Sequence, residues 1–126
     1  LIFGISTWDY GELQEDWESC WQEVAQLDLS GKILALYGMG DQVGYSEWFQ
    51  DALGMLHEQL LSTDAYITGY WPNLGYDFIS SKALTADKES FVGLSLDDET
   101  QYELTDNRIE QWVKKLNDEI KEILAA

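Results

Sequence analysis

The chain has 126 residues, of which 45% are hydrophobic, and this length and composition fit one globular domain and exclude a disordered chain. Its formal net charge of −17 argues against nucleic acid and anionic lipid as partners and favours basic partners. No apolar run approaches the roughly 20 residues of a membrane helix. The single cysteine, Cys20, cannot form an internal disulfide, so we expect a cytoplasmic protein.

The beginning of the chain predicts a strand, a loop and a helix. Leu1–Ile5 is an apolar strand, and a polar and aromatic loop, 6–11, follows it. A helix should then bury the apolar residues at helical spacing, which are Leu13, Trp17, Cys20, Trp21, Val24 and Leu27. Because the chain opens directly on an apolar strand and lacks an initiator Met, we expect that an upstream piece is absent.

A second strand and helix follow. Ile33–Tyr37 is almost continuously apolar, which is typical of a strand covered on both faces of a parallel sheet. A glycine-rich turn, 38–44, ends this strand. A helix should begin near Ser46 and bury Phe49, Ala52, Leu53, Leu56 and Leu60.

Two further strands are expected, at about Ala65–Tyr70 and at Phe91–Leu96. The stretch between them, 71–90, is too long and irregular for an ordinary connection, so we interpret it as an insertion in or beside an edge strand. A closing helix from Thr105 should bury Ile109, Trp112, Val113, Leu116, Ile120, Ile123 and Leu124. This order predicts a single α/β domain, 1–126, with a parallel sheet and helices on its faces.

The glycine-rich turn is the first candidate for a binding site. It is similar to a dinucleotide-binding fingerprint, but its third glycine falls one place late. Asp41 in the turn and Glu47 just after it would repel a pyrophosphate. A neutral, planar heterocycle meets no such repulsion, and Tyr45 could stack on it.

A second loop should lie beside this turn. Trp8 follows one parallel strand as Tyr45 follows the next, so both aromatic residues are expected at the carboxyl edge of the sheet, where ligands of such sheets bind. Asp97, directly after another strand, should emerge at the same edge. The alternative is that Trp8 and Tyr45 only pack on their own loops.

No catalytic or metal-binding pattern is found. His57 is the only histidine and has no partner at ligand spacing, and Cys20 lies on an apolar helix face and suits packing. The acidic run 97–99 lacks the alternating oxygen ligands and the glycine of a calcium loop, and we interpret it as solvated.

Two segments, Ser6–Trp17 and Gly38–Tyr45, resemble the long-chain bacterial flavodoxins, and most closely the flavodoxin 2 type. The resemblance continues through Gly69–Pro72, Gly75–Phe78 and Phe91–Leu94 to Arg108 and Trp112, and it covers essentially the whole chain.

The resemblance implies a flavodoxin-like sheet of strand order 2-1-3-4-5, for which this family is a standard example. It implies non-covalent binding of FMN and the transfer of single electrons at low potential, not enzymatic catalysis. It also implies that the chain is N-terminally incomplete, with strands 3, 4 and 5 and their helices present. The absent part would be about 50 residues, namely a strand, the loop that binds the FMN phosphate, a helix, a second strand and a connection. Residues 71–90 would be the insertion of the long-chain class.

The residues that the resemblance assigns to cofactor binding are Thr7, Trp8, Asp9, Tyr10, Gly11, Met39, Gly40, Asp41, Tyr45 and Asp97. Trp8 and Tyr45 would stack on the two faces of the flavin ring. The backbone of Gly40 and Asp41 would bind its pyrimidine edge, and the Asp9–Tyr10 peptide would face flavin N5.

The implied partners are basic redox proteins, such as an NADPH-dependent flavodoxin reductase, and the complete protein is expected to be a monomer. Two alternatives stay open. The glycine-rich turn could belong to an NAD(P)-binding oxidoreductase domain. This chain could also be a non-functional fragment that is unable to hold FMN.

Overall fold

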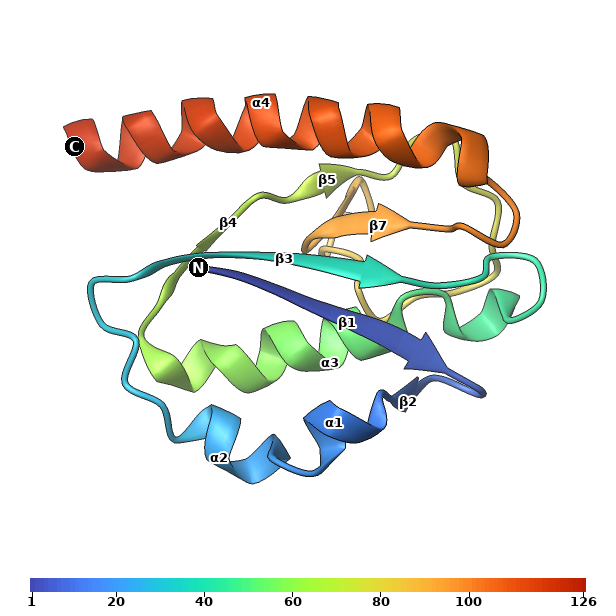
Figure 1. The fold of residues 1–126 in the computed structure, drawn as a ribbon, viewed down its shortest axis with the longest axis horizontal. Helices are drawn as coiled ribbons and strands as arrows, with labels where there is room; N and C mark the ends of the chain where they lie inside the picture. The colour runs from blue at the N-terminus through green and yellow to red at the C-terminus, as the bar shows by residue number, and fades with distance from the viewer.

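A mostly parallel β-sheet forms the centre of the molecule, and helices cover both of its faces (Figure 1). The computed structural model describes all residues, 1–126. Helix α4 (Thr105–Ala125) lies on one face of the sheet. Helices α1 (Glu15–Glu18), α2 (Trp21–Ala25) and α3 (Asp51–Leu60) lie on the other face. The predicted α/β architecture is confirmed. No helix combines the length and the apolar composition that a membrane crossing requires.

Strands β1 (Ile2–Trp8) and β3 (Ile33–Met39) form the longest parallel pair. Strands β4 (Tyr66–Thr68) and β7 (Leu94–Leu96) both pair in parallel with β3, the former with its first half and the latter with its second half. Two short strands therefore follow one another along the same side of β3. The chain between them makes a small antiparallel ladder of β5 (Trp71–Pro72) and β6 (Ser90–Phe91).

The apolar run in β3 is explained by two separate cores. Leu34 and Leu36 are fully buried in the core that α2 and α3 cover, and Ala35 is buried between the sheet and α4. Because side chains alternate between the faces of a strand, a strand covered on both faces must be apolar throughout. The prediction from the sequence is confirmed, with Tyr37 as a partly exposed exception.

The first predicted helix was wrong in its extent. Leu13 belongs to the two-residue strand β2 (Glu12–Leu13), which pairs with the end of β1, and the helical part is divided into α1 and α2. The division falls at Ser19 and Cys20, where the Ser19 hydroxyl donates a hydrogen bond to the Asp16 carbonyl (2.8 Å). Apolar spacing alone does not reveal such a break, because both short helices keep the same face toward the core.

The second predicted helix begins later than expected, at Asp51 instead of near Ser46. Ser46–Trp48 is a 3₁₀ turn, η1, and Gln50 adopts a left-handed conformation (φ 62°) before α3 begins. The side chains predicted to be buried are buried, namely Phe49, Ala52, Leu53, Leu56 and Leu60. In α4, Trp112 and Leu116 are buried, whereas Ile109 and Val113, also predicted to be buried, are 40% and 47% exposed. Their side of the helix faces solvent.

One edge of the sheet is open along β1. The only strand on the side away from β3 is β2, and it pairs with Thr7 and Trp8 alone. The N–H and C=O groups of the earlier part of β1 therefore have no strand partner on that side. Ile2 is 56% exposed there.

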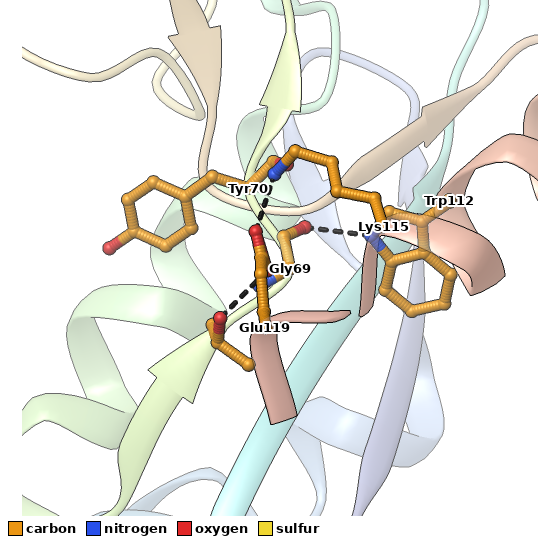
Figure 2. A network of polar contacts seen from close by, with 6 residues as sticks. Gly69, Tyr70, Trp112, Lys115 and Glu119 are labelled. Atoms are coloured by element: carbon orange, nitrogen blue, oxygen red, sulfur yellow. Dashed lines mark hydrogen bonds and ion pairs between the residues drawn. The ribbon is translucent and has the colours of Figure 1, made fainter. Parts of the chain in front are cut away.

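A polar network joins α4 to the end of β4 (Figure 2). The Glu119 carboxylate accepts hydrogen bonds from the Thr68 hydroxyl (2.8 Å) and the Gly69 N–H (2.9 Å), and it pairs with Lys115 (2.7 Å). The Trp112 indole N–H donates to the Gly69 carbonyl (2.7 Å). Burial raises the pKa of Glu119, but the bonds from Lys115, Thr68 and Gly69 outweigh it and hold the pKa below its ordinary value.

Replacing Glu119 tests whether this network stabilises the fold. Glu119→Gln should lower the free energy of unfolding by about 1 kcal/mol, because the amide loses the charged contact with Lys115. Since folding lowers the pKa of Glu119, this contribution is present above the unfolded pKa of about 4.3 and is lost as the pH falls through the folded value. Urea unfolding at pH 7 and pH 3 measures both effects. Glu122→Gln, at an exposed position of the same helix, is the control. Equal losses in the two variants would contradict the prediction.

Candidate functional site

A cavity of about 460 Å³ lies at the carboxyl edge of the sheet, where β1, β3 and β7 end. The arrowheads of these strands point to the same side of the molecule (Figure 1). The cavity is lined by Ser6, Thr7, Trp8, Asp9, Met39, Gly40, Asp41, Tyr45, Asp98 and Glu99. The structure thus brings together the loops after two parallel strands, as expected from the sequence, and adds the segment after β7.

Two aromatic residues come to the cavity from neighbouring loops. Trp8 ends β1 and is 47% exposed, and Tyr45, in the loop after β3, is 40% exposed. Tyr10 packs edge-on against Tyr45 (ring centroids 6.3 Å apart) and against Trp48 (5.0 Å). Tyr10 therefore packs against Tyr45 but does not line the cavity itself.

The turn after β3 is closed by its own carboxylate. Asp41 Oδ1 accepts hydrogen bonds from the N–H groups of Val43 (3.0 Å) and Gly44 (2.7 Å). A Cβ at Gly44 would lie 2.5 Å from Asp41 Oδ2, so a side chain here would displace the carboxylate that closes the turn. The amides that a phosphate would need are already bound to an anion, which argues physically against a dinucleotide at this turn.

The loop after β1 contains an unusual backbone conformation. Asp9 is left-handed (φ 47°), a conformation that Asp tolerates better than most residues, and Gly11 has φ 83°. A side chain at Gly11 would lie 2.9 Å from Asp51 Oδ2, so the loop passes close to α3 at this point. Asp9 lines the cavity and Gly11 does not. The assignment of Gly11 to cofactor binding stays a prediction.

Asp97 also lies at this edge, but its side chain is fully buried and does not line the cavity. It accepts hydrogen bonds from Gln42 N (3.0 Å), Gln42 Nε2 (2.8 Å), Thr100 N (2.9 Å) and Thr100 Oγ1 (2.6 Å). Burial raises the pKa of Asp97, and the bonds from Thr100 and Gln42 outweigh it, so that the pKa lies below its ordinary value. The cavity is lined instead by Asp98 and Glu99.

Sequence reasoning missed three lining residues, Ser6, Asp98 and Glu99. The signal for the last two was present, because they follow a strand whose end lies at the same edge. Ser6 shares its face of β1 with Trp8, two residues on, which is the period of a strand.

Charge around the cavity is of one sign. The charged residues of its lining are all acidic, namely Asp9, Asp41, Asp98 and Glu99, and the lining contains no Lys, Arg or His. Such a site suits the neutral, planar part of a ligand and disfavours an anionic group. No group of three or more His, Cys, Asp or Glu side chains is arranged to hold a metal ion.

Comparison with known proteins gives consistent results. The flavodoxin family model matches residues 1–112. Flavodoxin 2 of Salmonella typhi is 55% identical over 122 residues, which are 97% of this chain and 70% of the relative. A flavodoxin of Nostoc sp. is 49% identical over 119 residues, which are 94% of this chain and 69% of the relative.

The fold is similar to that of solved flavodoxins. The structure of Fusobacterium nucleatum flavodoxin bound to flavin mononucleotide superposes with a TM-score of 0.87 at 26% sequence identity. The superposition covers 94% of this chain and 70% of the Fusobacterium chain.

Replacing Asp97 tests the buried carboxylate. Asp97→Asn should lower the free energy of unfolding by about 1 to 3 kcal/mol, because an amide cannot accept from both backbone N–H groups and both side-chain donors at once. The pKa of Asp97 is lowered in the folded protein. The difference in free energy of unfolding between the variant and wild type should therefore be complete above about pH 4, and it should narrow as the pH falls through the folded pKa. Urea unfolding between pH 7 and pH 3 measures it. Glu99→Gln removes the same charge at an exposed position. A loss no larger than that of Glu99→Gln would refute the role.

Proposed function

This chain belongs to the flavodoxin family, and from this premise we propose that it is an electron carrier that binds FMN non-covalently at the cavity between Trp8 and Tyr45. The position and the lining of the cavity carry the proposal. The cavity lies at the carboxyl edge of a parallel sheet, it has an aromatic residue on each of two adjacent loops, and a solved protein of similar fold binds FMN. Flavodoxins are electron-transfer proteins and not enzymes.

FMN supplies the one-electron chemistry, and the protein supplies binding, orientation and electrostatics. We assign Trp8 and Tyr45 to the two faces of the flavin ring. Thr7 lines the same cavity, and its hydroxyl accepts a hydrogen bond from Ala52 N (3.0 Å), which ties the first loop to α3.

The polar edge of the ring would be bound by the backbone after β3. Gly40 N donates to the Leu96 carbonyl (3.0 Å), so this N–H is not available to a ligand. The Gly40 carbonyl and the Asp41 N–H make no hydrogen bond within the protein. An acceptor beside a donor suits the pyrimidine edge of a flavin, which presents N–H and C=O groups side by side.

The acidic residues around the cavity support a low reduction potential of a bound flavin. Asp9, Asp98 and Glu99 make the arrival of an electron on a ring beside them less favourable, and about 1.4 kcal/mol of such repulsion corresponds to roughly 59 mV for a one-electron step. The same charge supports a carrier role over an NAD(P)-binding domain, since Asp41 occupies the amides that a pyrophosphate would need.

The phosphate of FMN has no evident place in this cavity, and we propose that it is bound by residues outside this chain. Three observations support this. No cation lines the cavity, the first part of β1 has an open edge, and the chain spans about 70% of the length of its curated relatives. A strand paired with the open, earlier part of β1 and running parallel to it would direct the loop that follows it toward the cavity edge of the sheet.

We further propose basic redox partners, such as a reductase, that approach the acidic rim of the cavity, and a monomeric carrier in the cytoplasm when all parts are present. Residues 71–90 correspond in this proposal to the insertion of the long-chain class. The net charge and the single free cysteine, Cys20, agree with these assignments.

Titration with FMN and with riboflavin, which lacks the phosphate, tests whether this chain binds the flavin ring but not the phosphate. This chain should bind the two with dissociation constants within about threefold of each other, because it contributes only ring contacts. When the N-terminal segment of Salmonella typhi flavodoxin 2 is joined to this chain, the affinity for FMN should rise more than the affinity for riboflavin.

Tryptophan quenching reports the binding, and Trp8→Phe should reduce the quenching more than Trp21→Phe does. No flavin binding by either chain would refute the carrier proposal. Binding by the joined chain alone would mean that this chain by itself is a fragment unable to hold FMN. Strong FMN selectivity in this chain alone would refute the proposal for the phosphate.

Electrostatic steering predicts a salt effect on electron transfer. The association rate of the FMN-loaded joined chain with a basic reductase should fall as ionic strength rises from about 0.01 to 0.3 M. Stopped-flow measurement at several salt concentrations gives the slope of the association rate against ionic strength. The double variant Asp9→Asn/Glu99→Gln should flatten it, while Glu110→Gln, on the exposed side of α4, should not. A slope that is the same for all three proteins would show that the rim does not guide the partner.

A further inference from the structure

Gln42 is the one fully buried side chain in the loop that carries Tyr45. It is 3% exposed, whereas its neighbour Val43 is 71% exposed. Residues 41–44 therefore contain no buried apolar side chain, and the one aromatic contact of the loop is that of Tyr45 with Tyr10. Hydrogen bonds must position the rest of the loop.

The Gln42 side chain joins three segments that are far apart in the sequence. Its Nε2 donates to Asp97 Oδ2 (2.8 Å), and its backbone N–H donates to the same oxygen (3.0 Å). Its Oε1 accepts from Asp77 N (2.7 Å), in the stretch 71–90. A weaker contact runs from Nε2 to the Thr100 hydroxyl (3.4 Å).

The orientation of this amide is fixed by its partners. Ionised Asp97 can only accept, so Nε2 must face it, and the Asp77 N–H can only donate, so Oε1 must face that group. A glutamate here would place a second carboxylate against Asp97, and a leucine would satisfy neither partner.

The other end of the loop is held by the same stretch of chain. The Ser46 carbonyl accepts hydrogen bonds from Ile79 N (3.0 Å) and Ser80 N (3.2 Å), and the Ser46 hydroxyl accepts from Ile79 N (2.9 Å). Tyr45 lies between these bonds and the Gln42 bonds. The stretch 71–90 therefore holds the loop on both sides of the aromatic residue that lines the cavity.

We propose that Gln42 is a positioning residue, which sets the location of Tyr45 and of the Asp41 N–H at the ring cavity by joining their loop to Asp97 and to the backbone of Asp77. This inference rests on the proposed function, in that the cavity takes a flavin ring. Gln42 does not line the cavity, but it keeps the loop that lines it in the conformation that binds the ring.

The test uses this chain with Gln42→Glu and Gln42→Leu, and Val43→Ala serves as the matched control at the next, exposed position. Hydrogen exchange of the Val43 and Gly44 amides, without any flavin, measures how well the loop is held. Both Gln42 variants should exchange at least about tenfold faster at these amides, relative to amides of β3 in the same protein. Val43→Ala should leave the exchange of the Gly44 amide unchanged.

Lumiflavin, which is the ring without ribityl phosphate, is the probe for the cavity. Its affinity should fall about tenfold in both Gln42 variants at pH 7 and should be unchanged in Val43→Ala. A protonated glutamate has the shape of glutamine and can donate to Asp97, so Gln42→Glu should recover affinity and exchange protection as the pH is lowered. Gln42→Leu should not recover.

Loop amides that exchange as in wild type, or a loss of lumiflavin affinity that acid does not restore in Gln42→Glu, would overturn the proposal. If wild type binds no lumiflavin, the flavin assignment of this cavity fails, and the exchange data still decide whether Gln42 holds the loop. If the Gln42→Glu variant does not fold at pH 7, its exchange and binding are compared with wild type at the lower pH where the introduced carboxyl group is protonated.

Discussion

The parallel pairing of β1 with β3 is the constraint on which the rest of the structure depends. Its register, which places Ser6 opposite Met39, brings the residues after both strands to the same edge. Trp8 and Tyr45 line the same cavity for this reason, although they are far apart in the sequence. The pairing of β7 with the second half of β3 adds the acidic segment 97–99 to the same edge. The two cores on the faces of the sheet stabilise this arrangement but do not form the site.

Polar bonds, in contrast, shape the loops of the site, and acidic residues do much of this work. Asp41, Asp51 and Asp97 each accept a hydrogen bond from a backbone N–H, and Asp97 does so while fully buried. Asp9, Asp98 and Glu99 line the cavity. The net charge of −17 therefore has two separate uses near the site. One part fixes loop geometry, and the other part gives the cavity a negative potential.

The sequence predicted most of the architecture because its strongest patterns are local. The apolar run of β3 and the periodic apolar residues of α4 each reflect the element that contains them. The site residues Trp8 and Tyr45 were predictable because each follows a parallel strand. The direction of Asp97 was not, since it depends on a bond to Gln42, which is 55 residues away in the chain. For the same reason the sequence alone does not distinguish Gln42 from the other polar residues of its loop.

The fold, the acidic cavity and the family together support one central claim, namely that the flavin ring binds between Trp8 and Tyr45. Nuclear Overhauser effects between the dimethylbenzene protons of bound lumiflavin and the aromatic protons of the protein test it most directly. The account predicts contacts to Trp8 and Tyr45 and none to Trp21 or Trp112, which lie on α2 and α4. Contacts at saturating lumiflavin to Trp21 or Trp112, or to neither Trp8 nor Tyr45, would contradict it.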